Sequence, residues 1–123
     1  MNSTDIFISP SLKFSISDLS ETIRNKIQCN TFHINHLNDL KNHVFGDKLF
    51  IILDNDDHHA LYQSIIEYLS SIQSEILIKL LCIKSDIIDC VCYNSEAGFR
   101  TLKRSNYFNI YTDLTQFLEQ QLN

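Results

Sequence analysis

The stretch Lys48-Leu-Phe-Ile-Ile-Leu-Asp54 decides the fold that we expect for this chain. Its five consecutive apolar residues lack the alternation that a strand with one solvated face would show. A short uninterrupted run of this kind is typical of a central parallel strand that helices cover on both faces. Open α/β sheets keep their functional groups beyond the carboxyl ends of such strands, so Asp54 becomes a candidate site residue.

The rest of the chain alternates short apolar runs with amphipathic segments, which predicts an α/β fold. Helices are expected between the strands, because apolar residues recur there at helical spacing. The predicted strands are 5–8, 31–34, 49–53, 76–83 and 107–111. Segment 86–104 is less clear: 86–93 suits either a helical turn or a strand, whereas Phe99 and Leu102 suggest a helix. The pattern therefore predicts a single domain, 1–123, with three layers in a (βα)5 arrangement and a parallel sheet.

Composition excludes several functions. The formal net charge is -5 and only two glycines are present, so neither a P-loop nor a dinucleotide-binding loop is possible. Basic residues are scattered apart from Arg100, Lys103 and Arg104, which disfavours nucleic-acid binding by this chain alone. No apolar run approaches the roughly 18 residues that cross a bilayer, and no signal peptide is evident. We expect a cytoplasmic protein that does not enter membranes.

The cysteines and histidines do not form a ligand pattern. Cys90-Val-Cys92 has one intervening residue, which is a poor match to zinc or redox pairs. In a chain without an export signal, the four cysteines are expected to be reduced and mostly buried. Neither His33-x-x-His36 nor His58-His59 has a second cluster at ligand spacing. We expect no metal and no cofactor.

The order and spacing of the elements resemble the receiver domain of two-component response regulators, a flavodoxin-like fold with strand order 2-1-3-4-5. The resemblance covers nearly the whole chain and rests on pattern. It implies that Asp54 stands at the phospho-acceptor position. The metal-binding acids of the family fall on Ser9 and Pro10, its hydroxyl residue on Lys84, and its lysine on Tyr111.

These replacements indicate a degenerate receiver, or pseudo-receiver. Phosphoryl transfer to a carboxylate needs a cation to stabilise developing charge, and Mg²⁺ is usually held by carboxylates. Ser9 and Pro10 supply none, and Tyr111 cannot replace a lysine. Magnesium-dependent phosphorylation of Asp54 is therefore not expected. Lys84 has two open interpretations: it pairs with Asp54 and locks the site, or it points into solvent.

The resemblance implies a non-enzymatic regulatory domain, as in the amino-terminal part of LuxR/FixJ-type transcription regulators. Such a domain would contact DNA only through a downstream domain, which this chain does not contain. It would form a homodimer or bind a protein partner through the last helices and the fifth strand. The corresponding candidates for the interface are Arg100, Lys103, Tyr107 and Phe117.

Two other classes of function remain open. The acidic balance and the cluster Asp54–Asp57 also suit a stand-alone binding or immunity-type protein that covers a basic site on a partner. Alternatively, Asp54 could work with His58 or His59 as an acid–base pair in a small enzyme.

Overall fold

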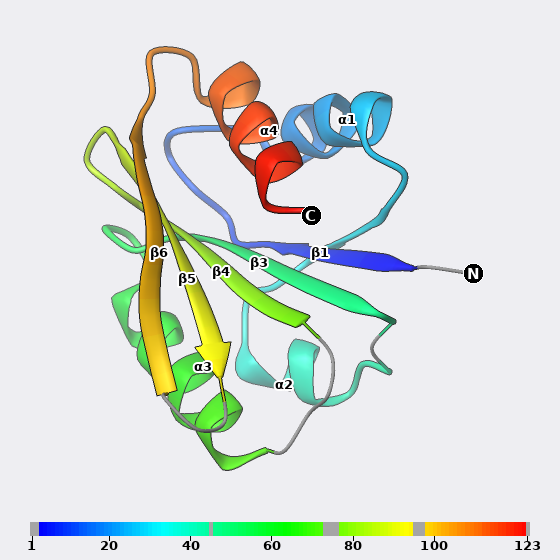
Figure 1. Ribbon diagram of the computed structural model, residues 1–123, viewed down its shortest axis with the longest axis vertical. Helices are drawn as coiled ribbons and strands as arrows, with labels where there is room; N and C mark the ends of the chain where they lie inside the picture. Colours follow the sequence, from blue (N-terminus) through cyan, green and yellow to red (C-terminus); the bar gives the residue numbers. More distant parts are fainter. Residues whose placement is uncertain (1–2, 45, 73–76, 95–97, 123) are drawn as a thin grey trace.

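The structure is a computed structural model, and it describes residues 3–44, 46–72, 77–94 and 98–122. One six-stranded sheet lies between two layers of helices, and its strand order is β2-β1-β3-β4-β5-β6 (Figure 1). In chain order the elements are β1 (Thr4–Ile8), α1 (Ile16–Lys26), β2 (Asn30–His33), α2 (Leu37–Lys41), β3 (Lys48–Asp54), α3 (His59–Ser71), β4 (Leu77–Lys84), β5 (Ile87–Asn94), β6 (Gly98–Asn106) and α4 (Ile110–Gln121).

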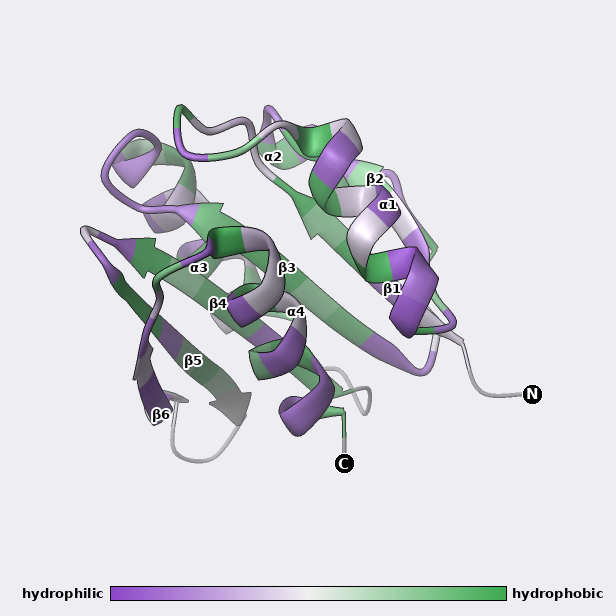
Figure 2. Cartoon of the chain, turned by 90° about the horizontal axis from the view of Figure 1, so that it is seen from above, coloured by the Kyte–Doolittle hydropathy of each residue, from purple (hydrophilic) through white to green (hydrophobic). Residues whose placement is uncertain are grey.

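The first four strands are parallel, and β3 is central as its apolar run predicts. β3 pairs with β1 on one side and with β4 on the other, and six of its seven residues are buried. The central strands are green along most of their length in Figure 2, as expected for strands with two covered faces. This part of the fold confirms the α/β class.

The predicted all-parallel (βα)5 sheet with order 2-1-3-4-5 is wrong, because the last two pairings are antiparallel. β4 pairs antiparallel with β5, and β5 pairs antiparallel with β6. Only Ser85 and Asp86 separate β4 from β5, and Ser85 adopts a positive φ of 55°. A parallel partner would require a crossover of about a dozen residues, so this tight turn forces a hairpin.

The end of the chain also differs from the expectation. Segment 107–111 is not a strand, because the sheet is completed by β5 and β6 and α4 already begins at Ile110. The open segment 86–93 belongs to β5, and the helix expected around Leu102 is part of β6. A bulge between Cys90 and Val91 shifts the register of β6, which hides the strand alternation in the sequence.

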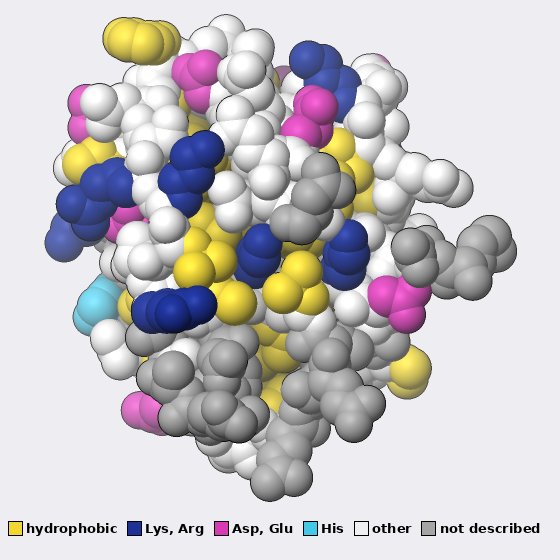
Figure 3. Space-filling model, viewed as in Figure 1, with side chains coloured by type: hydrophobic (Ala, Val, Ile, Leu, Met, Phe, Trp, Pro, Cys, Tyr) yellow, Lys and Arg dark blue, Asp and Glu magenta, His cyan; other side chains and the backbone are white. Residues whose placement is uncertain are grey.

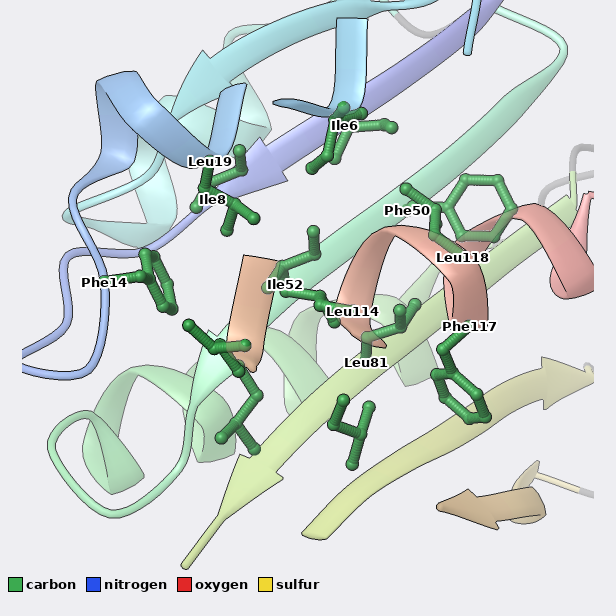
Figure 4. Packing of buried hydrophobic residues seen from close by; sticks show 14 of the residues in the cluster. Ile6, Ile8, Phe14, Leu19, Phe50, Ile52, Leu81, Leu114, Phe117 and Leu118 are labelled. Atoms are coloured by element: carbon green, nitrogen blue, oxygen red, sulfur yellow. The ribbon is translucent and has the colours of Figure 1, made fainter. Parts of the chain in front are cut away.

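Two apolar cores lie on the two faces of the sheet. The core under α1 and α4 joins β-strand residues such as Ile8, Phe50 and Leu81 to Leu114 and Leu118 of α4 (Figure 4). The opposite core joins the other face of the same strands to α2 and α3. The alternation of side chains along β3 thus fills both cores at once, which explains why its sequence is apolar throughout.

Candidate functional site

Asp54 ends β3 at the carboxyl edge of the sheet, and its side chain is completely buried. The carboxylate oxygen Oδ2 accepts a hydrogen bond of 2.6 Å from Ser11 Oγ. The oxygen Oδ1 accepts hydrogen bonds from Lys13 Nζ at 3.3 Å and from the backbone N–H of Asp56 at 3.1 Å. Both oxygens are therefore engaged by groups of the protein itself, as a buried charge requires.

Lys13 is the cation of this site, and it joins two carboxylates. Its ammonium lies 3.3 Å from Asp54 Oδ1 and 2.7 Å from Asp56 Oδ2, with 26% of the side chain exposed. Burial lowers the pKa of Lys13, but the hydrogen bond to Asp56 and the charge of Asp54 outweigh it and raise the pKa overall. The hydrogen bond from Lys13, with one from the backbone N–H of Ser85, lowers the pKa of Asp56.

Ser9 and Pro10, to which the receiver resemblance assigns the metal-binding acids, follow the end of β1. Ser9 is fully buried, its Oγ accepts a hydrogen bond of 3.2 Å from the backbone N–H of Asp54, and its own N–H donates to the Ile52 carbonyl at 3.0 Å. Ser9 therefore fastens β1 to β3. Pro10 is partly exposed and lines a shallow hollow beside this loop.

Lys84 is not the residue that pairs with Asp54. It is exposed at the end of β4, and its positive charge contributes to lowering the pKa of Asp56. Among the described residues, the salt bridge to Asp54 comes from Lys13. Of the two interpretations of Lys84, the exposed side chain fits the one in which it points into solvent. The cation that pairs with Asp54 comes instead from the loop between β1 and α1.

Tyr111 does not end a strand, contrary to the prediction, because it lies in the first turn of α4. Its hydroxyl accepts a hydrogen bond of 3.1 Å from the backbone N–H of Ser15, which fastens α4 to the start of α1. Tyr107 lies in the loop before α4, and its hydroxyl donates to the carbonyl of Ser85. Burial raises the pKa of Tyr107. Both tyrosines thus tie loops together at the carboxyl edge.

The other interface candidates lie where β6 passes α4. Arg100 and Lys103 are exposed on β6. Lys103 Nζ donates to Gln120 Oε1 at 2.7 Å and lies 5.9 Å from the centre of the Phe117 ring. Phe117 itself is only 3% exposed and belongs to the core, so it cannot form an interface in the folded protein.

The histidines beside Asp54 have structural contacts. His58 precedes α3, and its backbone N–H, not its ring, donates to the Asp54 carbonyl at 2.9 Å. The ring of His59 lies 3.2 Å from Asn55 Oδ1 and stacks on Tyr62. Neither contact gives Asp54 an acid–base partner. The described residues contain no group of three or more metal-ligating side chains, and within this part of the chain the cysteines form no disulfide.

Sequence reasoning missed Ser11 and Lys13, which complete the site. The available signal was positional: the loop after β1 opens at the same edge of the sheet as Asp54. Lys13 is also the first lysine or arginine of the chain, and it lies in the loop that follows the first predicted strand.

No family model matches this chain, and neither the curated proteins nor the solved structures provide a match. Within the described residues, no helix has the length and apolar character that crossing a membrane requires.

Proposed function

We propose that this chain is a non-enzymatic protein-interaction domain that binds its partner at the carboxyl edge of the sheet. The observation that carries the proposal is the exposure of Phe108 and Leu12, which reaches 99% and 94%. Both belong to loops at the edge that carries Asp54. Large apolar and aromatic side chains that lose all contact with water on binding are typical anchors of protein interfaces.

Hydrogen bonds order the loop backbone at both of these residues. The backbone N–H of Phe108 donates to Asp113 Oδ2 at 2.6 Å, and that of Leu12 donates to Asp57 Oδ2 at 3.2 Å. Lys13, next to Leu12, is fixed by its two carboxylate partners. A surface that is already ordered loses less conformational entropy on binding, so these contacts favour association.

A hollow beside Leu12 gives the surface a place for a partner side chain. Its volume is about 310 Å³, and its lining comprises Pro10, Ser11, Leu12, Asp57 and His58. An exposed apolar side chain next to a shallow apolar hollow suits a contact in which each partner inserts a side chain into the other.

The Asp54 network supports the non-enzymatic part of the proposal. A catalytic carboxylate must reach a substrate, whereas Asp54 is completely buried and accepts hydrogen bonds from Ser11, Lys13 and Asp56. In this proposal the network is a scaffold that holds the loop of Leu12. The interaction role does not depend on the receiver resemblance, whose parallel sheet the topology contradicts.

The test uses a photo-crosslinking amino acid at position 108, with the same substitution at position 44 as the matched control. Val44 is also apolar and 90% exposed, but it lies in the loop before β3. In extract from cells that make the protein, we expect a discrete adduct from position 108, and its loss when Leu12→Ser is added. Equal adducts from both positions, or none from position 108, would contradict the proposal.

A second experiment tests the absence of phosphoryl chemistry at Asp54. We expect no mass gain of one phosphoryl group after incubation with acetyl phosphate and Mg²⁺, because Lys13 and Ser11 already occupy the carboxylate. A phosphorylated product that disappears in the Asp54→Asn variant would show that the site is active.

A further inference from the structure

The outer edge of β6 carries an unusual combination of backbone geometry and charge. The sheet ends at β6 (Figure 1), so in the described structure the outer side of this strand has no neighbouring strand to pair with its backbone N–H and C=O groups. Such an edge can accept another strand. All five residues of segment 100–104 are exposed, which leaves the strand accessible along its middle.

The charge of this edge is opposite to that of the whole chain. β6 contains three cations, Arg100, Lys103 and Arg104, and no acidic residue, although the chain has a formal net charge of -5. Figure 3 shows Lys and Arg side chains gathered along the side of the molecule where β6 lies. The edge is therefore a local basic strip on an acidic protein.

Part of this charge has no acidic partner among the described residues. Arg104 forms two hydrogen bonds with the carboxylate of Asp89, at 2.7 and 3.0 Å. Lys103 contacts the neutral amide of Gln120, and in the described part of the chain no acidic side chain forms a salt bridge with Lys103 or Arg100. Two positive charges thus remain available to a partner.

From this combination we propose that β6 binds an extended, acidic segment of another protein as a seventh strand. The segment would hydrogen-bond to the outer backbone groups of β6, and its carboxylates would face Arg100 and Lys103. Leu102, at the bulge, has no partner on β5 and is 42% exposed, so it offers one apolar contact.

The same features disfavour other occupants. A second copy pairing through its own β6 would bring cations opposite cations, which is destabilising across a strand pair. Cations and a bulge at an edge are known devices against non-selective pairing, and here they leave an acidic strand as the complementary partner. Binding of a nucleic acid is disfavoured because β6 offers few cations for phosphate contacts, and a nucleic acid cannot pair with a strand edge.

The test is a titration of the whole chain with an acetylated heptapeptide in which glutamate alternates with valine. The control peptide has lysine in place of glutamate. We expect shifts of the amide resonances of residues 98–106, and slower hydrogen exchange of those that point outward, with the acidic peptide only. No shift in β6 at millimolar peptide, or equal binding of the lysine peptide, would overturn the proposal.

Charge reversal sharpens the test. The double variant Arg100→Glu/Lys103→Glu should weaken peptide binding about tenfold or more, since it replaces attraction by repulsion at the interface. Lys26→Glu/Lys41→Glu is the matched control, because both lysines are exposed and the change in net charge is the same. Equal weakening in both variants would show a general charge effect and contradict the proposal.

The β6 proposal is independent of the role proposed for Leu12 and Phe108, so the two experiments can fail separately. Peptide-induced shifts confined to the loops of Leu12 and Phe108 would overturn the β6 proposal. Loss of the crosslink at position 108 would leave it untouched. Binding of a single-stranded oligonucleotide that displaces the acidic peptide from β6 would also count against a peptide-specific edge.

Discussion

In the parallel part of the sheet, β3 buries six of its seven residues, whereas every residue of segment 100–104 in β6 is exposed. The two strands lie in one sheet but have different structural roles. β3 fills the cores on both faces and positions Asp54 at its end. Residues 100–104 of β6 belong to neither core and are exposed to solvent. The comparison separates a part that determines the fold from a part available for contacts.

The largest effect should come from a truncation in the parallel part. Phe50→Ala removes a fully buried ring between β3 and α4, and we expect it to lower the free energy of unfolding by about 3–5 kcal/mol. The control in β6 is Leu102→Ala. This substitution should change the free energy of unfolding by less than about 0.5 kcal/mol, because the side chain is 42% exposed. Urea unfolding measures both. Similar losses would mean that the two regions do not differ in packing.

A second prediction compares two lysines near Asp54. Lys13→Met leaves the buried carboxylate without its cation, and we expect a loss of about 1–3 kcal/mol, below the cost for a fully buried pair because Lys13 is partly exposed. Lys84→Met should change the free energy of unfolding by less than about 0.5 kcal/mol, since Lys84 is exposed. A larger effect of Lys84→Met would indicate that Lys84, and not Lys13, pairs with Asp54.

A smaller effect is expected at Gly98, the first residue of β6. Gly98 has a φ of +74°, in the left-handed region that side chains disfavour, and a Cβ added there would meet no neighbouring atom. Gly98→Ala should therefore cost about 1 kcal/mol through backbone strain alone. Thermal unfolding checks this value. No loss of stability would indicate that the backbone at this position does not need glycine.

The smallest effect concerns pH. The pKa of Asp56 is lowered in the folded protein by Lys13 and the Ser85 N–H, so this carboxylate stabilises the fold above the unfolded pKa of about 3.9. The contribution is lost as the pH falls through the lower, folded pKa. Urea midpoints between about pH 5 and pH 2 should therefore fall more steeply for the natural chain than for Asp56→Asn.

Other carboxylates do not contribute to the difference in pH dependence between the natural chain and Asp56→Asn. Hydrogen bonds from backbone N–H groups also lower the pKa of Asp39 and of Asp113. Both residues are unchanged in the Asp56→Asn variant, so the difference between the two curves reports Asp56. Parallel curves would contradict the role given to the contact between Lys13 and Asp56.

The sequence was informative where one physical effect dominates. The apolar run Leu49–Leu53 predicts a strand buried on both faces, and the structure places it at the centre of the sheet. The position of Asp54 at the carboxyl edge follows from that strand. The turn at Ser85 was missed, because its two residues, Ser85 and Asp86, are neither the glycine nor the asparagine that usually marks a two-residue hairpin.

The candidate site could be predicted only in part, and the reason differs from the one that hid the turn at Ser85. A strand pattern shows which end of a strand carries a residue, but not which loop side chain folds back onto it. Lys13 follows β1 and Lys84 ends β4, and both strands end at the Asp54 edge. Only the path of the loop between β1 and α1 brings Lys13 to Asp54. The bulge at Leu102 similarly hides the alternation of β6 from any rule based on a period of two.

A double-mutant cycle measures whether Lys13 is the cation that pairs with Asp54. The cycle combines Asp54→Asn with Lys13→Met, and a parallel cycle combines it with Lys84→Met. We predict a coupling energy of about 1 kcal/mol or more between Asp54 and Lys13, and one below about 0.5 kcal/mol between Asp54 and Lys84. No coupling to Lys13, or a larger coupling to Lys84, would contradict the account.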